Sequence, residues 1–232
     1  MTSDSRPVLL FDLDETVLHV NSFPVWAAAV LAARFPAMPA PARLRTAARA
    51  AGAIALRKLG RIDHAELKRR LAPLWLDGLA ADPRQRAASA LHERLLATVR
   101  PSLQPLLAEV REGRVDAVLT TAAAAAYAEP LGRRLGFAQV VASGAGDENL
   151  GARKRDHTLE RLRELGWHRR RRVLLTDHLD DLPLVREADL SLWFGGADSL
   201  AEARRQARGA RIECGLSAAP PALRELALGT PA

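Results

Sequence analysis

Five short apolar runs recur along the chain, and most are separated by segments with helical periodicity. The first run, Val8–Asp12, is continuous and ends in a carboxylate; the others are Val115–Thr121, Gln139–Ala142, Val173–Asp177 and Leu190–Phe194. Continuous apolar runs are typical of strands that are buried on both faces of a parallel sheet. The pattern predicts an α/β fold with a three-layer, Rossmann-like core, in which ligands bind beyond the carboxyl ends of the strands.

One long stretch breaks this alternation, because residues 21–99 contain helical patterns only. The predicted helices are Trp26–Phe35, Arg43–Leu59, His64–Ala72 and Pro83–Val99. An all-helical insert of this size after the first strand is typical of a lid over an active site. We therefore predict a catalytic core formed by residues 1–20 and 100–232, and a helical cap formed by residues 21–99 that determines substrate specificity.

Charge and composition narrow the choice of partner. The net charge is +7, and basic residues exceed acidic ones by 16 to 7 between Val30 and Arg114. Aromatic residues make up only 4% of the chain and are not interleaved with the basic ones, so we expect no nucleic-acid partner. The start of the chain does not have the order of a secretory signal, and no apolar stretch is long enough for a transmembrane segment. With a single cysteine, Cys214, the sequence favours a cytoplasmic protein.

The basic excess of the insert leaves one further partner open. Together with apolar residues near the start of the insert, it would suit peripheral contact with anionic lipid headgroups. These residues are Phe23, Val25, Trp26, Val30 and Leu31. The favoured alternative is that they form the core of the insert itself.

Two carboxylates follow the first strand, in the segment Asp12-Leu-Asp14-Glu-Thr. Where a strand ends and the chain turns, side chains two residues apart can point into the same crevice. Asp12 can attack phosphorus as a nucleophile, while Asp14 protonates the leaving oxygen and later takes a proton from water. Because an anionic nucleophile is repelled by a phosphate dianion, this chemistry requires Mg²⁺ and further acidic ligands.

Candidate partners for these two acids lie after the other strands. Asp177, Asp180 and Asp181 follow the fourth run and can supply the additional metal ligands. Thr121 ends the second run and can donate a hydrogen bond to phosphoryl oxygens. Lys154, in the loop before the next predicted helix, is a rare lysine in an arginine-rich chain, and its compact ammonium suits a crowded phosphate site.

These four elements, in this order, resemble the motifs of the haloacid dehalogenase superfamily of hydrolases. The segments Tyr127–Gly136 and Val140–Ser143 are similar to its phosphoserine-phosphatase branch, which carries a helical cap between the first two motifs. The resemblance implies an aspartyl-phosphate intermediate at Asp12, acid/base catalysis by Asp14 and phosphate contacts from Thr121 and Lys154. It also implies Mg²⁺ binding by Asp12, Asp14 and Asp177, supported by Asp181 rather than Asp180.

The sequence departs from this branch at three positions. Asn21 stands where phosphoserine phosphatases have an acidic residue that recognises the amino group, so serine specificity is not expected. His178 replaces a small residue beside the metal ligand, and Glu15 replaces the commoner glycine. The predicted function is hydrolysis of a small-molecule or lipid-linked phosphomonoester. A non-catalytic phosphate-ligand or protein-binding module and a phosphomutase are the alternatives.

Overall fold

The computed structural model describes residues 6–62, 66–67, 70–71, 81–144 and 147–228. The chain divides into two compact units. One comprises Met1–Ser22 and Leu96–Ala232, and the other comprises Phe23–Leu95. These boundaries lie within a few residues of those predicted for the core and the cap. The covering role of the inserted unit remains a prediction.

The first unit is built on a six-stranded parallel sheet with the order β3-β2-β1-β4-β5-β6. The strands are β1 (Val8–Phe11), β2 (Asp116–Ala124), β3 (Gln139–Ser143), β4 (Arg172–Thr176), β5 (Leu190–Trp193) and β6 (Ile212–Cys214). β1 lies between β2 and β4, and all four of its residues are buried. The predicted α/β class and parallel sheet are therefore confirmed. The short edge strand β6 was not predicted.

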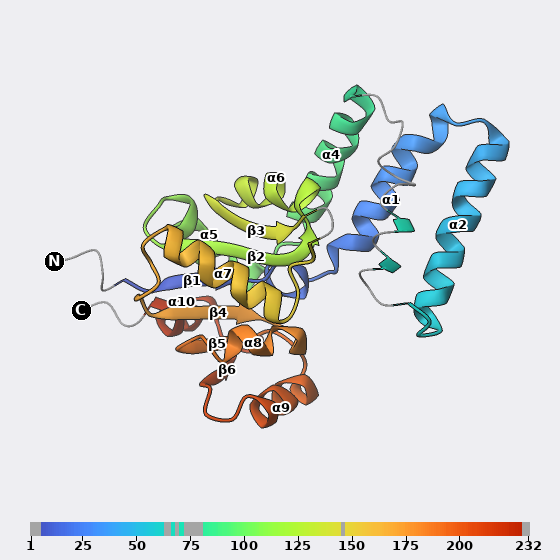
Figure 1. Ribbon diagram of the computed structural model, residues 1–232. Helices are drawn as coiled ribbons and strands as arrows, with labels where there is room; N and C mark the ends of the chain where they lie inside the picture. Colours follow the sequence, from blue (N-terminus) through green and yellow to red (C-terminus); the bar gives the residue numbers. More distant parts are fainter. Residues whose placement is uncertain (1–5, 63–65, 68–69, 72–80, 145–146, 229–232) are drawn as a thin grey trace. The chain divides into compact units, whose positions relative to one another are not determined.

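Helices cover both faces of the sheet, which gives the three layers (Figure 1). They are α5 (Gln104–Arg111), α6 (Ala125–Leu135), α7 (Ala152–Glu164), α8 (Leu182–Val185), α9 (Ala197–Gln206) and α10 (Pro220–Leu228). Val8 and Leu10 of β1 pack with Leu162 of α7 on one face. On the other face the rings of Phe11 and Phe137 meet edge to face, with their centroids 5.1 Å apart. The alternation of side chains along β1 thus supplies both layers of the core.

Two predicted boundaries were wrong, both near the site. β2 continues through the alanine tract to Ala124, because after a register shift Ala124 pairs with Ser143 of β3. Sheet pairing here outweighs the helix preference of alanine. Lys154 lies in the first turn of α7 rather than in the preceding loop, since α7 begins at Ala152.

The inserted unit contains α1 (Ser22–Arg34), α2 (Ala40–Lys58) and α4 (Ala81–Leu96). Phe23 and Trp26 of α1 are buried and their ring centroids are 5.9 Å apart, so these two residues belong to the interior. Much of the predicted helix His64–Ala72 falls outside the described residues. Within the part of the chain that is described, no helix is both long and apolar enough to cross a membrane.

The insert leaves and rejoins the core through two adjacent segments. Leu18 and Val99 form an antiparallel bridge. The amide of His19 donates to the carbonyl of Thr98 over 2.9 Å, and the amide of Arg100 donates to that of Val17 over 2.8 Å. Residues 17–19 and 98–100 therefore form a short paired stem.

Candidate active site

A row of polar side chains begins where the apolar part of three neighbouring strands ends. Leu10 is paired with Val118 of β2 and with Leu174 of β4. Two residues further along each strand, on the same face of the sheet, stand Asp12, Thr120 and Thr176. All three are buried. The helix that covers this face is α7, so its first turns meet a polar row instead of an apolar one.

Lys154 of α7 is the centre of this polar layer. Its Nζ donates to Asp12 Oδ1 over 2.6 Å and to Asp181 Oδ2 over 2.7 Å. Asp181 Oδ2 also accepts from Thr176 Oγ1 over 2.6 Å. Lys154 is 2% exposed, and although burial alone lowers the pKa of a lysine, the two carboxylates raise the pKa of Lys154 above its ordinary value. The ammonium is therefore a fixed positive charge.

Asp12 and Asp177 share a crowded anionic environment. Burial, assisted by the charges of Asp181 and Asp177, raises the pKa of Asp12 despite the nearby ammonium. Burial and the charges of Asp181 and Glu15 raise the pKa of Asp177 to about 6, although Thr16 Oγ1 donates to Asp177 Oδ1 over 3.0 Å. Removing several carboxylates from water in one place disfavours their charged forms. Burial is therefore the main cause of both raised pKa values, and the neighbouring carboxylates add to it.

Asp14 is oriented from a different direction. Its Oδ1 accepts from the backbone amide of Ser22 over 2.7 Å. The hydroxyls of Ser22 and Tyr127 are 2.8 Å apart and both side chains are buried. Burial and the charge of Asp14 raise the pKa of Tyr127, so the phenol stays protonated. Ser22 and Tyr127, which sequence reasoning missed, thus fix the segment that holds the second carboxylate.

Asn149 is another residue that sequence reasoning missed. It is fully buried, and its Nδ2 donates to the carbonyls of Thr121 and Val141 over 3.0 and 3.1 Å. Its backbone amide donates to Ser143 Oγ over 2.9 Å. One side chain thereby ties the ends of β2 and β3 to the segment that leads into α7. The signal in the sequence was its place shortly before Lys154, in the segment Asn149–Lys154.

Thr121 is buried, and its Oγ1 accepts from the amide of Ala123 over 3.1 Å. It lies at the same edge of the sheet as Asp12, because Leu119 of β2 is paired with Phe11 of β1. The predicted role of Thr121 in phosphate binding remains a prediction.

Arg100 supports the turn that follows Asp12. Its guanidinium donates to the carbonyls of Thr16 and Glu15 over 3.0 and 2.6 Å and lies over the ring of Phe194, 5.3 Å from the centroid. Glu15 has φ 56° and ψ −2°, a left-handed conformation that is costly for any residue with a Cβ. A glycine here would avoid this cost, and Arg100 helps to hold the strained turn.

The backbone after Asp177 is approached closely by another loop. A Cβ placed on Gly195 would lie 2.4 Å from the carbonyl oxygen of Asp177 and 2.5 Å from Ser199 Oγ. Glycine at this position therefore allows the segment after β5 to pass against the Asp177 turn.

The three remaining predicted residues lie at the surface. Asn21 is exposed, next to the Ser22 amide that binds Asp14. His178 is exposed, and its Nδ1 accepts from the amide of Asp180 over 3.2 Å. Asp180 is exposed as well, whereas Asp181 is 2% exposed and binds Lys154. Of the two competing acids, the structure brings Asp181 and not Asp180 to the polar layer.

The donor set can be tested against Mg²⁺, the predicted cofactor. Among the described residues, no group of three or more histidine, cysteine, aspartate or glutamate side chains is arranged to hold a metal ion. Asp12 and Asp177 nevertheless offer buried carboxylate oxygens, which are the donor type that Mg²⁺ prefers. Neighbouring carboxylates are among the causes that raise the pKa of both residues, and a bound cation would offset this repulsion. Because Mg²⁺ retains several waters and needs only one or two protein carboxylates, these two residues fit the ion.

The fold and this site define the class of protein. Residues 9–186 match the family described as haloacid dehalogenase-like hydrolase, and the chain belongs to that family. The predicted resemblance is thereby confirmed. A search of curated proteins gave no match.

Solved structures that share the fold have low sequence identity. One is a protein of unknown function from Bordetella pertussis Tohama I, with 18% identity, a TM-score of 0.70 and coverage of 90% of this chain and 98% of that one. A HAD family hydrolase from Salmonella enterica serovar Typhi has 14% identity and a TM-score of 0.61, covering 96% and 72%. A phospho-aspartyl intermediate analogue of phosphoserine phosphatase has 12% identity and a TM-score of 0.55, covering 91% and 94%.

Proposed function

We propose that this chain is a Mg²⁺-dependent phosphomonoesterase in which Asp12 forms an aspartyl-phosphate intermediate. The observation that carries the proposal is the contact of Lys154 with both Asp12 and Asp181, buried at the carboxyl end of the sheet. Membership of a hydrolase family and similarity in fold to a phosphoserine phosphatase support it. A small phosphate ester is the substrate class that this chemistry serves.

In the first half-reaction a carboxylate oxygen of Asp12 attacks phosphorus and the ester P–O bond breaks. Asp14 gives its proton to the leaving alkoxide. In the second half-reaction Asp14 takes a proton from water, whose oxygen attacks phosphorus and restores the Asp12 carboxylate. Inorganic phosphate leaves. Lys154 holds Asp12 in place and offsets negative charge on the phosphoryl oxygens.

A divalent cation would be held by Asp12 and Asp177, with Asp14 and Asp181 as the other predicted ligands. When bound, it would neutralise the phosphoryl oxygens and allow the anionic nucleophile to approach. Asp181 accepts hydrogen bonds from Lys154 and Thr176, and this favours a supporting role for it.

Phosphate release from p-nitrophenyl phosphate tests the proposal. The wild-type chain with Mg²⁺ should release phosphate, and Asp12→Asn should abolish release while remaining folded by circular dichroism. Asp180→Asn, which removes an exposed carboxylate from the neighbouring turn, is the matched control and should keep most of the activity. Equal rates for Asp12→Asn and Asp180→Asn would reject the nucleophile assignment.

A covalent test separates the alternatives. Acid quenching during turnover should leave a phosphoryl group on the peptide that contains Asp12, detected by mass spectrometry. A non-catalytic binding module would give neither this adduct nor free phosphate. A phosphomutase would give the adduct but return the phosphoryl group to another hydroxyl of the substrate, so little free phosphate would accumulate.

Substrate choice is assigned to the inserted helical unit and to Asn21. If the exposed Asn21 replaces the acidic residue that recognises an amino group, Asn21→Asp should increase the rate for phosphoserine relative to p-nitrophenyl phosphate. An unchanged ratio would remove Asn21 from the specificity determinants. A panel of metabolite phosphates and lipid phosphates would identify the natural class.

A further inference from the structure

Helix α2 has an apolar strip on the side that faces away from its own unit. The buried face of the helix is formed by Thr46, Ala50 and Ala53. With 3.6 residues per turn, the opposite face holds Leu44, Ala48, Ala51, Ala55 and, one residue past the end of the helix, Leu59. All five are exposed, and Leu44 and Leu59 are 72% and 74% exposed. We call these five residues the α2 strip.

The α2 strip is long and flat. The rise of 1.5 Å per residue places Leu44 and Leu59 about 22 Å apart along the helix axis. Ile54, 44% exposed, lies to one side of the strip. The outward face of a helix usually carries polar side chains, so this exposed row with a leucine at each end is a candidate contact surface.

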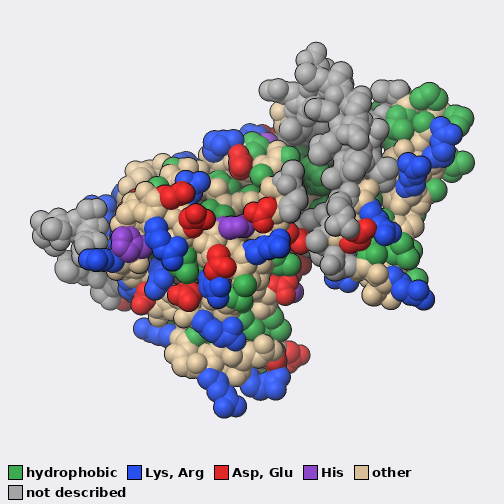
Figure 2. Space-filling model, viewed as in Figure 1, with side chains coloured by type: hydrophobic (Ala, Val, Ile, Leu, Met, Phe, Trp, Pro, Cys, Tyr) green, Lys and Arg blue, Asp and Glu red, His purple; other side chains and the backbone are tan. Residues whose placement is uncertain are grey.

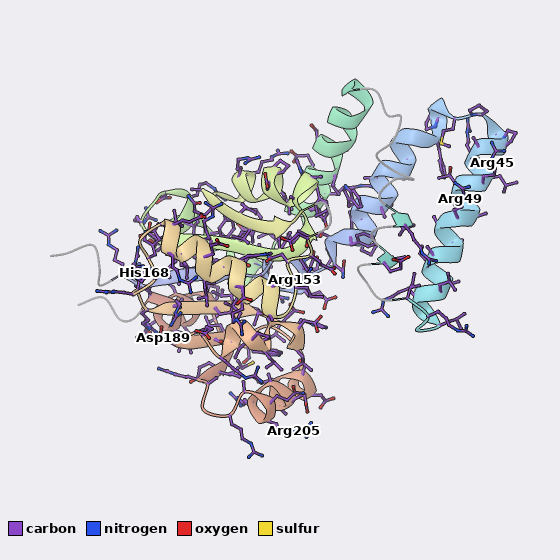
Figure 3. All side chains as sticks on the ribbon, in the orientation of Figure 1. Arg45, Arg49, Arg153, His168, Asp189 and Arg205 are labelled. Atoms are coloured by element: carbon purple, nitrogen blue, oxygen red, sulfur yellow. The ribbon has the colours of Figure 1, made fainter. Side chains whose placement is uncertain are left out.

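The charged residues of α2 are all basic, and no acidic residue accompanies them. At about 100° per residue, Arg45 lies at one edge of the strip. Arg49, Arg43 and Arg57 lie on the opposite half of the helix, around the buried face, and the Nε of Arg43 donates to the carbonyl of Met38. Figure 3 labels Arg45 and Arg49 on α2, and Figure 2 shows basic and hydrophobic side chains together over this helix. An apolar row opposite a basic face is typical of helices that lie in a membrane interface.

The charge bias extends beyond the helix. Residues 16–62 contain no aspartate or glutamate at all. In the same range the basic residues are Arg34, Arg43, Arg45, Arg49, Arg57, Lys58 and Arg61. A protein partner would present a mixture of charges, whereas an anionic lipid leaflet presents negative charge over a continuous surface. A basic segment without acidic residues is complementary to such a leaflet.

We propose that the α2 strip and the arginines of α2 bind the surface of an anionic lipid bilayer. The leucines enter the boundary between headgroups and acyl chains, and the guanidinium groups bind lipid phosphates. This assignment differs from the membrane contact considered for Phe23 and Trp26, because both of those side chains are buried. It does not depend on the proposed phosphatase reaction.

Flotation of the full chain with vesicles tests this proposal. Vesicles that contain phosphatidylglycerol should carry the protein with them, whereas vesicles of pure phosphatidylcholine should not, at a fixed and moderate ionic strength. The variant Arg45→Glu with Arg49→Glu should weaken partitioning at least about 30-fold, which corresponds to about 2 kcal/mol at 1.4 kcal/mol per factor of ten. The variant Leu44→Gln with Leu59→Gln should weaken it on the same vesicles without a change of net charge.

A control with matched charge separates a defined surface from the overall positive charge. Arg169→Glu with Arg208→Glu reverses two exposed arginines of the α/β unit and should change partitioning less than about threefold. If this control loses as much binding as the α2 variant, only the net charge of the chain attracts the lipid and the proposal is wrong.

Two further results would also overturn the proposal. One is the absence of flotation with anionic vesicles. The other is a concentration-dependent dimer, measured by light scattering, that the Leu44→Gln, Leu59→Gln variant dissociates while wild-type partitioning is absent; the strip would then be a contact between two copies. Release of p-nitrophenol by every variant should match the wild type, so a failure here is distinct from a failure of the proposed reaction.

Discussion

The Nζ of Lys154 lies 2.6 Å from Oδ1 of Asp12, and both side chains are buried, although 142 residues separate them in the chain. The second contact of the ammonium, with Asp181, draws the β4 end into the same cluster. Three distant segments thus meet around one cation. The ammonium of Lys154 therefore helps to fix the position of the Asp12 carboxylate.

Lys154→Met should reduce both stability and hydrolysis. Methionine has similar length but leaves Asp12 and Asp181 without their shared partner, and breaking a buried ion pair costs about 3–5 kcal/mol of the free energy of unfolding. Loss of the charge beside the phosphoryl group should lower kcat at least about 100-fold. Urea unfolding and p-nitrophenyl phosphate turnover measure the two effects. Arg153→Met, at an exposed position of the same helical turn, is the control and should change stability by less than about 0.5 kcal/mol.

Asp177 should make stability depend on pH in the absence of divalent cations. Its pKa is raised to about 6 from the ordinary 3.8, so between these values the folded state binds a proton that the unfolded chain does not. Stability contributed by the neutral form is therefore present below pH 4 and is lost as the pH rises through about 6, by about 3 kcal/mol.

Asp177→Asn should remove this loss, because the amide has the shape of the protonated acid without its titration. In EDTA, urea unfolding should give similar stabilities for wild type and variant at pH 4 and a more stable variant at pH 7. Added Mg²⁺ should stabilise the wild type more than the variant at pH 7. A wild type as stable as Asp177→Asn at pH 7 in EDTA would contradict the raised pKa.

Asn149→Asp should be strongly destabilising despite its near-identical shape. The change replaces a donor that serves the carbonyls of Thr121 and Val141 with an anion that faces the same oxygens. We expect a loss of about 3 kcal/mol or more in the free energy of unfolding. The same substitution at the exposed Asn21 is the control for charge and should have little effect on stability. Comparable losses at both positions would show that Asn149 does not hold the strand ends.

Arg100→Lys should lower activity more than stability. Lysine keeps the charge near Asp177 and Glu15 but cannot donate to both carbonyls of the turn in the fixed geometry of the guanidinium. We expect kcat to fall about tenfold and the Mg²⁺ concentration for half-activation to rise, because Thr16 in this turn orients Asp177. Activity measured across a Mg²⁺ titration checks this. If Arg100→Lys had the same kcat and the same Mg²⁺ concentration for half-activation as the wild type, Arg100 would have no role in the site.

Glu15→Gly should stabilise the chain, unlike most glycine substitutions. The left-handed backbone at Glu15 costs about 1–2 kcal/mol for a residue with a Cβ, and glycine relieves it. The greater flexibility of glycine in the unfolded chain offsets part of this gain, which leaves about 0.5–1 kcal/mol. Thermal unfolding tests the sign, and a lower melting temperature for the variant would indicate that the Glu15 side chain makes a compensating contact.

The sequence predicted the sheet because buried parallel strands leave a strong signal. Val8–Phe11 and Leu190–Trp193 are fully apolar or nearly so, and both were found within one residue of their actual ends. β6 was missed since three residues with one buried side chain carry no periodicity. The second predicted strand ended at Thr121, three residues short of Ala124, because the helix preference of the following alanines does not reveal the pairing of Ala124 with Ser143.

The acidic residues of the candidate site were recognisable because each follows a predicted strand. Residues that act through the backbone were not. Arg100 and Asn149 exert their effects by donating to main-chain carbonyls, and such partners are set by the fold and not by any motif. The strained φ of Glu15 could not be predicted either, and the sequence showed only that glutamate stands in place of glycine there.

The paired stem formed by residues 17–19 and 98–100 has a consequence for how this protein can diversify. Because the chain departs and returns at neighbouring points, everything between them can be lengthened, shortened or exchanged without redirecting a single strand. New recognition surfaces, including a lipid-facing one, could be acquired there while the hydrolytic chemistry stayed unaltered. Evolution can therefore change the binding surfaces of the inserted unit independently of the catalytic residues of the core.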